Sequence, residues 1–355
     1  MTILVFCPNL VGDTAMATPA FRALRAGFPG ARIVAVIKPK VAATIDGGPW
    51  FDGRIGFDPK SGRREERGPA VLERLRAERP DVAVLFPNSF RSALMAWRSG
   101  ARRRVGYARG GRGLLLTDRL APPRDGRGAF VPSPIVDYYG AIPKALGCAG
   151  DGPRIELYTT IEDEAATDRA FDRLSLSRSR PIVTLNTGGA FGPAKSWPAG
   201  HFAALAGRLA GEAGADVLVV CGPGERDAAR EIVALADRPG VVSLADEPPS
   251  LGLTKACIRR SALLVTTDSG PRHFAAGFNV PVITLFGPTH IAWTLTHHAR
   301  ALHLHHPVPC GPCQRPICPR KHHRCLRDLS PDAVFAAAVR MLEGRGVGAE
   351  RIEAV

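Results

Sequence analysis

Asp13 is the first residue in the chain that could do chemistry. It closes a short segment that follows an apolar, strand-like run from Thr2 to Pro8. A strand there would put Asp13 on a loop at the carboxyl edge of a sheet, where ligands bind in open α/β folds. Its carboxylate could accept a proton from a substrate hydroxyl. It could equally be a turn residue that hydrogen-bonds its own backbone.

A glycine-rich loop with one lysine follows another apolar run. The segment Asn186 to Pro198 reads NTGGAFGPAKSWP, with Thr187, Gly188 and Gly189 at its start. Backbone N–H groups in such a loop can cradle an anion, and Lys195 adds a mobile positive charge. The pattern favours a phosphate site, although an ordinary surface loop with one lysine stays open.

The stretch Ala262 to Pro288 has the pattern of strand, helix and strand. Asp268, Ser269 and Gly270 stand at the turn, where the free N–H groups of a helix start would suit a diphosphate. His273, expected on the first helical turn, could bind phosphate or sugar. A plain crossover with an interior histidine is the alternative.

Glu225 stands at a third strand end, after Val217 to Cys221. It could accept hydrogen bonds from ribose hydroxyls, or simply complement a helix dipole. The common fingerprints Gly-x-Gly-x-x-Gly, Gly-x4-Gly-Lys-Ser/Thr and Gly-x-Ser-x-Gly are absent from the expected positions.

Four cysteines cluster near the carboxyl end of the chain, at Cys310, Cys313, Cys318 and Cys325. Four thiolates on a short loop could ligate zinc or an iron–sulfur cluster. Their spacing is not that of a zinc ribbon, so packed free thiols or a labile disulfide remain open.

Alternating strand and helix patterns position these residues. They predict an α/β fold with two Rossmann-like domains facing a cleft, since repeated strand–helix units form parallel sheets. We expect an N-terminal domain over 1–160, a C-terminal domain over 178–330 and a C-terminal helix over 331–343. A frayed tail is expected after Gly344.

The formal net charge of +14 is concentrated in two segments. Arg91 to Arg127 holds ten arginines against two aspartates, and Arg300 to Arg327 holds five arginines and one lysine without an acid. Such patches attract phosphate-bearing partners. No apolar run reaches membrane-span length and no secretory signal is evident, so we expect a soluble, cytoplasmic protein in a reducing compartment.

Taken together, these residues resemble the ADP-heptose:lipopolysaccharide heptosyltransferases (glycosyltransferase family 9), most closely their heptosyltransferase II branch. The similarity spans Met1 to about Leu342. It is carried by segments that occur in the family's order: Val11–Gly12–Asp13 with Ala17–Ala20, Phe86–Ala93, Gly192–Pro198, Thr267–His273, Leu285–Thr289 and the Cys310–Cys325 loop.

The resemblance implies an inverting glycosyltransferase of the GT-B type, without metal or other cofactor. It would transfer heptose from ADP-L-glycero-D-manno-heptose to the inner-core heptose of lipopolysaccharide. The acceptor, a phosphorylated lipid A-core, would be held by the N-terminal domain, and the enzyme would be peripheral to the inner face of the inner membrane.

The resemblance also implies residue roles. Asp13 would be the catalytic base, and Thr187 and Lys195 would bind the diphosphate. The remaining positions would lie near the ribose, the diphosphate or the donor sugar: Glu225, Asp268, Ser269, Gly270 and His273. Two departures from the family pattern are Asn186–Thr187–Gly188 in place of Pro-Gly-Ala, and Arg272 in place of an apolar residue.

Three alternatives remain open at this point. A related glycosyltransferase would use another nucleotide sugar or acceptor, and a sugar-nucleotide epimerase would convert the nucleotide sugar alone. A nucleic-acid-binding protein would suit the pI of about 10.0. The low aromatic content of 6% offers no stacking platform, so nucleic acid is not the expected partner.

Overall fold

The computed structural model describes the whole chain except residues 177–178, 190 and 346–347. It divides into two compact units. Unit 1 comprises Met1–Tyr158 with Ala292–Thr294, and unit 2 comprises Thr159–Ile291 with Leu295–Val355. Residue 178, the predicted first residue of the C-terminal domain, lies outside the described residues.

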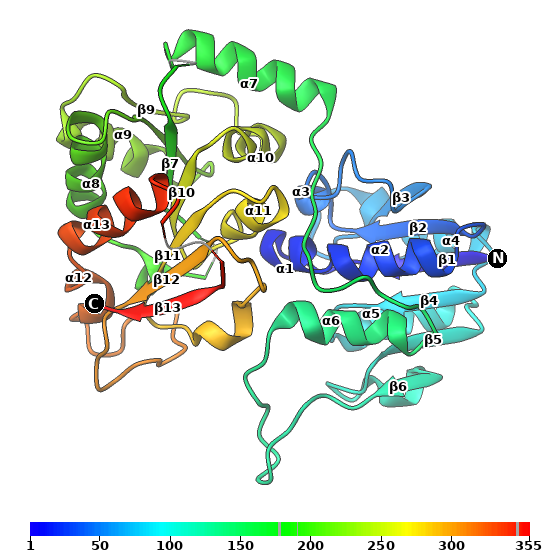
Figure 1. Cartoon of the computed structure of the whole chain (residues 1–355). Helices are drawn as coiled ribbons and strands as arrows, with labels where there is room; N and C mark the ends of the chain where they lie inside the picture. Colours follow the sequence, from blue (N-terminus) through cyan, green and yellow to red (C-terminus); the bar gives the residue numbers. More distant parts are fainter. Residues whose placement is uncertain (177–178, 190, 346–347) are drawn as a thin grey trace. The chain divides into compact units, whose positions relative to one another are not determined.

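Unit 1 is built on a six-stranded parallel sheet in the order β3-β2-β1-β4-β5-β6 (Figure 1). The chain moves outward from the centre in both directions, so the crevice at the carboxyl ends of β1 and β4 is the topological switch point, where such sheets bind ligands. The strands are β1 (Thr2–Phe6), β2 (Arg32–Ile37), β3 (Gly53–Gly56), β4 (Val82–Leu85), β5 (Arg103–Tyr107) and β6 (Asp118–Leu120).

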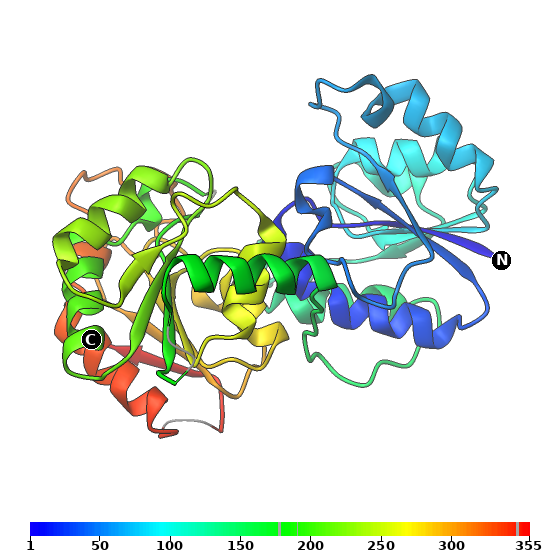
Figure 2. The same ribbon diagram turned by 90° about the horizontal axis from the view of Figure 1, so that it is seen from above.

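Helices cover both faces of this sheet, as Figure 2 shows for the blue and cyan layers on opposite sides of the strands. Leu4 and Phe6 share one face with Leu75 of α4 and Ala93 of α5. On the other face, the ring of Phe86 packs between those of Phe21 and Tyr139. The helices are α1 (Val11–Met16), α2 (Thr18–Gly27), α3 (Pro39–Ala42), η1 (Arg64–Glu66), α4 (Gly68–Ala77), α5 (Phe90–Arg98), η2 (Arg112–Leu115) and α6 (Ile135–Lys144).

Unit 2 contains a seven-stranded parallel sheet in the order β13-β12-β11-β10-β7-β8-β9. The central strands β7, β8, β10 and β11 are buried and mostly apolar because both faces of the sheet are covered there, whereas the edge strand β13 is largely exposed. They are β7 (Ile182–Asn186), β8 (Asp216–Val220), β9 (Val241–Ser243), β10 (Leu263–Thr267), β11 (Val282–Phe286), β12 (Ala301–His305) and β13 (Arg351–Ala354).

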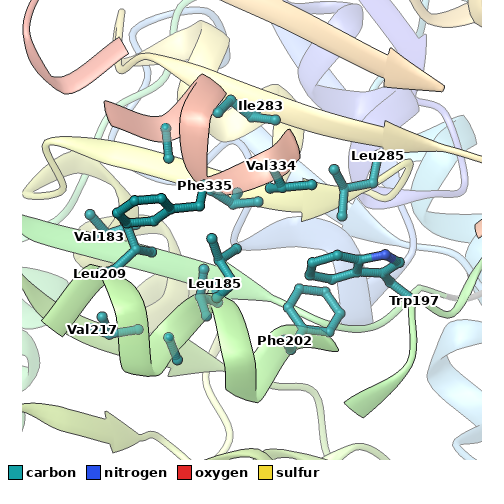
Figure 3. Close-up of a cluster of buried hydrophobic side chains, with 14 of the residues drawn as sticks. Val183, Leu185, Trp197, Phe202, Leu209, Val217, Ile283, Leu285, Val334 and Phe335 are labelled. Carbon is teal, nitrogen blue, oxygen red and sulfur yellow. The ribbon is translucent and has the colours of Figure 1, made fainter. Parts of the chain in front are cut away.

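Alternation along β8 divides the core of unit 2 into two layers. Val217 and Val219 join a large cluster with residues of α8, α9 and α13, drawn in Figure 3, in which the Trp197 indole lies beside the Phe202 ring. Leu218 and Val220 pack on the other face with α7 and α10. The helices are α7 (Ile161–Arg173), η3 (Pro193–Lys195), α8 (Ala199–Gly211), α9 (Arg226–Ala236), α10 (Leu251–Arg259), α11 (Arg272–Gly277), α12 (Arg324–Arg327) and α13 (Pro331–Leu342). The short helix η4 (Ile291–Thr294) falls mostly in the residues of unit 1.

Two local expectations were wrong. Asp13 does not lie on a loop, because α1 begins at Val11, and the Thr14 hydroxyl donates to the Leu10 carbonyl at 2.8 Å across its first turn. A helix of six residues is too short for its apolar period to be recognised. The chain after Gly344 does not end as a frayed tail, since β13 pairs with β12.

The two parallel sheets confirm the predicted pair of Rossmann-like α/β folds. Among the helices that the structure describes, none is both long enough and apolar enough to cross a membrane.

The packing around Phe202 yields a stability prediction. Its ring is fully buried and lies 4.8 Å from the Trp197 ring, so Phe202→Ala should destabilise unit 2 by roughly 3–5 kcal/mol through lost burial and a cavity. Peptide-resolved hydrogen exchange of β7 measures this loss. Leu235→Ala, at a site 57% exposed on α9, should change stability by less than about 0.5 kcal/mol. Equal protection in both variants would contradict the described core.

Candidate functional site

A buried ion pair joins two strand ends of unit 2. The Lys195 ammonium lies 2.6 Å from Oδ2 of Asp268 and donates to the Asp268 backbone carbonyl at 2.8 Å. The Thr289 hydroxyl donates to the same Oδ2 at 2.7 Å. Side-chain exposure is 13% for the lysine and 5% for the aspartate. The structure therefore brings together two residues predicted from loops after β7 and β10.

The charge state of Asp268 follows from these neighbours. Burial opposes its ionisation, but the positive charges of Lys195 and Arg272 outweigh that effect and lower the pKa of Asp268 to about 2. The carboxylate is therefore ionised at neutral pH and holds Lys195 at a defined position. An ionised carboxylate repels a diphosphate, so Asp268 can orient the Lys195 ammonium toward a ligand rather than bind the phosphates itself.

The lysine loop takes its shape from contacts that need glycine. Gly192 has φ of +138°, and a Cβ there would lie 2.6 Å from the Pro316 carbonyl oxygen. That oxygen accepts a hydrogen bond from Ala194 N at 3.0 Å. The Lys195 ammonium lies over the Phe191 ring, with Nζ 4.6 Å from the ring centroid in a cation–π contact. The cysteine-rich segment thus supports the loop that carries Lys195.

Asn186 links the ends of β7 and β10. Its amide donates to the Thr266 hydroxyl at 2.9 Å and to the Ser269 hydroxyl at 2.8 Å. A Cβ on Gly189 would lie 3.1 Å from Cβ of Ser269, so the glycine lets the two loops approach closely. Asn186 thus fixes Ser269 beside the glycine loop.

Glu225 lies at the start of α9 and is held by its own turn. Its Oε2 accepts a hydrogen bond from Gly222 N at 2.8 Å. Its carboxylate also fills the space beside Gly188, where a Cβ would come within 1.8 Å. The structure thus places Glu225 against the predicted phosphate loop, but not in contact with the Lys195–Asp268 pair.

Two predicted ligand residues carry buried polar atoms that the protein does not satisfy. Among the described residues, neither the Thr187 hydroxyl nor Nδ1 of His273 has a hydrogen-bond partner. Burial, followed by the charge of Arg272, lowers the pKa of His273 well below its ordinary value, so the imidazole is neutral. Buried groups of this kind cost free energy unless a ligand or water pairs with them, which fits a binding site.

The helix expected after Asp268 is short. It spans Arg272–Gly277, and the N–H groups of Arg272 and His273 already donate to Ser269 and Gly270 carbonyls at 3.3 and 3.1 Å. The sequence-based expectation of an open helix start therefore overstated the donors available at that point. Ser269 and Gly270 instead form the turn beside the buried ion pair.

All eight cysteines are free thiols, so the labile disulfide does not occur in this structure. Cys310 Sγ lies 3.8 Å from Nε2 of His322. Within the described ranges, no group of three or more His, Cys, Asp or Glu side chains is arranged to hold a metal ion. The segment instead packs on the site loops, with Gln314 N donating to the Pro288 carbonyl at 2.8 Å.

Asp13 lies half-buried in the first turn of α1. Burial raises the pKa of the Tyr139 phenol well above its ordinary value, and the nearby negative charge of Asp13 raises it further. The tyrosine is therefore neutral. Asp13 lies in the helix that follows β1, beyond the carboxyl end of that strand, where open parallel sheets present catalytic groups.

A pocket of about 540 Å³ opens at the same edge of unit 1. It is lined by the ends of β1, β2 and β4 and by the start of α5, and three of its lining residues are the cations Lys38, Lys60 and Arg91. Within the part of the chain that the structure describes, no salt bridge joins these three side chains to an acid. The lining also contains one carboxylate, Asp58, so the pocket presents an excess of positive charge to a ligand.

Other arginines of the basic Arg91–Arg127 segment serve the fold. Arg112 is fully buried, and its guanidinium donates to the carbonyls of Pro87 and Tyr107 and to the Asn88 side chain. Burial lowers the pKa of Arg112 to about 10, so it still carries its charge. Arg103 pairs with Asp118 at 2.7 Å. The charge of this segment is therefore only partly available to a partner.

Three residues of the buried charge cluster were not predicted as site residues. Thr289 stands directly after β11 and Gly287–Pro288, so its place at a strand end was a usable signal. Arg272 was expected on the helix after Asp268, but no role in the site was predicted for it. Glu350 lies 3.9 Å from Arg272 Nη2, and nothing in its local sequence indicates this contact.

The low pKa of Asp268 links stability to pH. A folded-state value of about 2 lies below the ordinary 3.8, so the stabilisation is complete above about pH 4 and is lost as the pH falls toward 2. Asp268→Asn should remove a pH-dependent contribution on the order of 2 kcal/mol, measured by urea unfolding between pH 2.5 and 6. Asp227→Asn, which changes a fully exposed carboxylate, is the control. Identical pH profiles for the two variants would contradict the paired state of Asp268.

Known proteins resemble the chain over nearly its whole length. The model of glycosyltransferase family 9 (heptosyltransferase) matches residues 70–323. Lipopolysaccharide heptosyltransferase 2 of Escherichia coli K12 is 30% identical over 344 residues, which cover 94% of this chain and 97% of that protein.

Solved structures agree. The E. coli ADP-heptose lps heptosyltransferase II superposes with a TM-score of 0.76 at 27% identity, covering 97% of this chain and 99% of that one. The glycosyl transferase family 9 protein of Veillonella parvula has a TM-score of 0.79 at 22% identity, covering 97% of both chains. The predicted resemblance, the GT-B fold class and transferase activity are confirmed, and the epimerase and nucleic-acid hypotheses are not favoured. The chain belongs to glycosyltransferase family 9, the heptosyltransferases.

Proposed function

We propose that the enzyme transfers heptose from ADP-L-glycero-D-manno-heptose to the inner-core heptose of lipopolysaccharide, with inversion of the anomeric centre. The relative in E. coli that matches 94% of this chain bears the name lipopolysaccharide heptosyltransferase 2, and the similar solved structure is an ADP-heptose heptosyltransferase II. The observation that carries the proposal is the buried Lys195–Asp268 pair beside unsatisfied polar atoms of Thr187 and His273.

Unit 2 would bind the donor. Lys195 and the backbone of the Thr187–Gly189 loop would hold the diphosphate, with Ser269 and Gly270 beside them and Glu225 near the ribose. Departure of ADP builds negative charge on the β-phosphate, and a preorganised ammonium stabilises that charge in the transition state. Neutral His273 would hydrogen-bond the phosphate or the donor sugar through its free ring nitrogen.

Unit 1 would bind the acceptor, a phosphorylated lipid A-core. Asp13 would remove the proton from the acceptor hydroxyl as that oxygen attacks the anomeric carbon, while ADP leaves from the opposite face. The cations of the 540 Å³ pocket suit phosphate or carboxylate groups on such an acceptor.

The test of this function is ADP release from ADP-heptose in the presence of heptosyl-Kdo2-lipid A. Asp13→Asn should lower turnover by roughly 10²–10⁴-fold because it removes the general base, while ADP affinity stays unchanged. Radiolabelled donor, with product analysis, measures both transfer and its stereochemistry.

Asp137→Asn is the matched control, since Asp137 is also an acid in the first turn of a helix of unit 1. It should retain full turnover. Undiminished transfer by Asp13→Asn would overturn the assignment of the base, and release of ADP only with another acceptor would overturn the assigned acceptor.

We also propose peripheral contact with the inner face of the inner membrane, where a lipid-anchored acceptor resides. In support, Leu114 is 88% exposed on η2, inside the basic Arg91–Arg127 segment. An exposed apolar side chain among cations suits an anionic bilayer surface.

Leu114→Glu should weaken co-sedimentation with vesicles that contain phosphatidylglycerol, because it removes apolar contact and adds repulsive charge. Ile161→Glu is the control, since Ile161 is 85% exposed on α7 of unit 2. Equal vesicle binding by wild type and both variants would argue against this surface.

A further inference from the structure

Arg272 is a buried cation directly behind the proposed donor site. Its side chain is 2% exposed, and its Nη1 lies 3.6 Å from Oδ1 of Asp268. Its guanidinium carbon lies 5.1 Å from the Phe286 ring centroid. A guanidinium removed from water needs nearby negative charge, since an unpaired buried charge is costly. Asp268 already pairs with Lys195, so balancing the charge of Arg272 requires a second carboxylate.

Glu350 supplies that second carboxylate from the segment just before β13. Its Oε1 lies 3.9 Å from Arg272 Nη2, and its side chain is 9% exposed. The same carboxylate accepts hydrogen bonds from Thr296 N at 3.0 and 3.1 Å and from His297 N at 2.8 Å. These bonds fix it beneath the sheet edge independently of the arginine.

His303 completes the surroundings of Glu350. Its Nε2 lies 2.8 Å from Glu350 Oε1 and 3.3 Å from Arg272 Nη2. Burial lowers the pKa of His303 to about 4, so the ring is neutral. An ionised carboxylate only accepts hydrogen bonds, so the network assigns the hydrogen to Nε2. Nε2 therefore cannot accept a hydrogen bond from Arg272, so the charge of the guanidinium is balanced by the carboxylates of Asp268 and Glu350.

The four charges balance in pairs. Lys195 has Asp268 at 2.6 Å, while Arg272 is shared between Asp268 at 3.6 Å and Glu350 at 3.9 Å. Without the charge of Glu350, one aspartate would face two buried cations. The Asp268 carboxylate would then be drawn toward the guanidinium and away from the lysine.

We propose that Glu350 is a positioning residue for the donor site: by neutralising Arg272 from behind, it leaves Asp268 free to hold Lys195 for the diphosphate. This inference rests on the proposed function, in which Lys195 binds the diphosphate. It also explains how the chain accommodates an arginine where the family pattern has an apolar residue.

The experiment compares the affinities of ADP and adenosine for the full-length protein, by calorimetry and ligand-observed NMR. Glu350→Gln keeps the shape of the side chain and removes its charge. It should lower the ADP affinity by roughly tenfold and leave adenosine affinity unchanged, because only the diphosphate meets Lys195. A merely structural defect would lower both affinities together.

Two further variants isolate the charge effect. Arg272→Met should keep an ADP affinity close to wild type, since Asp268 then has Lys195 alone. The double variant Arg272→Met/Glu350→Gln should recover the ADP affinity that Glu350→Gln alone loses. This double variant has no unpaired buried cation, so it tests the inference even where Glu350→Gln folds poorly.

Glu353→Gln, three residues along on β13, is the matched control, because it breaks only the partly exposed pair with Arg340. A wild-type ratio of ADP to adenosine affinity in Glu350→Gln would overturn the inference, as would a double variant that binds ADP no better than Glu350→Gln. If the wild-type protein bound no ADP, the proposed function would fail, and the donor role of Glu350 with it.

Discussion

The buried contact between Lys195 and Asp268 is the interaction on which the site of unit 2 depends. Removing two charges from water is costly unless geometry and further hydrogen bonds compensate. Here the compensation comes from the loops after three neighbouring strands, because Asp268 also accepts a hydrogen bond from the Thr289 hydroxyl and lies near Arg272. The parallel order of β7, β10 and β11 brings those loops together. The ion pair therefore requires the sheet, and it fixes the lysine where an anion can reach it.

The two units treat charge in opposite ways. In unit 2 the cations beside the ligand loops are matched by carboxylates, so the site is close to electrically neutral before a ligand enters. In unit 1 three cations line the pocket with a single carboxylate, Asp58, and none of the three forms a salt bridge among the described residues. A compensated lysine suits a ligand whose charge changes during reaction, whereas an excess of cations suits capture of an anionic acceptor. This division agrees with the proposed roles of the two units.

Much of the fold could be predicted from sequence, because buried parallel strands are short, continuous apolar runs such as Val217 to Val220. Residues at strand ends, including Lys195 and Asp268, could also be predicted, since parallel strands present their carboxyl ends at one edge. The start of α1 was missed because six residues carry too little periodic signal. Glu350 could not be foreseen, since its partner Arg272 is 78 positions away along the chain and pairs with it only after β13 joins the sheet.

Arg112 has a consequence for how the protein's formal charge should be understood. Its guanidinium is committed to the carbonyls at the end of β4 and β5, and Arg272 is likewise enclosed. Neither charge exchanges counterions with the solvent on binding, so neither contributes to the ionic-strength dependence of association. The electrostatic steering of an anionic partner is therefore weaker than a net charge of +14 suggests, and exposed cations such as Lys60 and Arg91 at the rim of the pocket contribute to it.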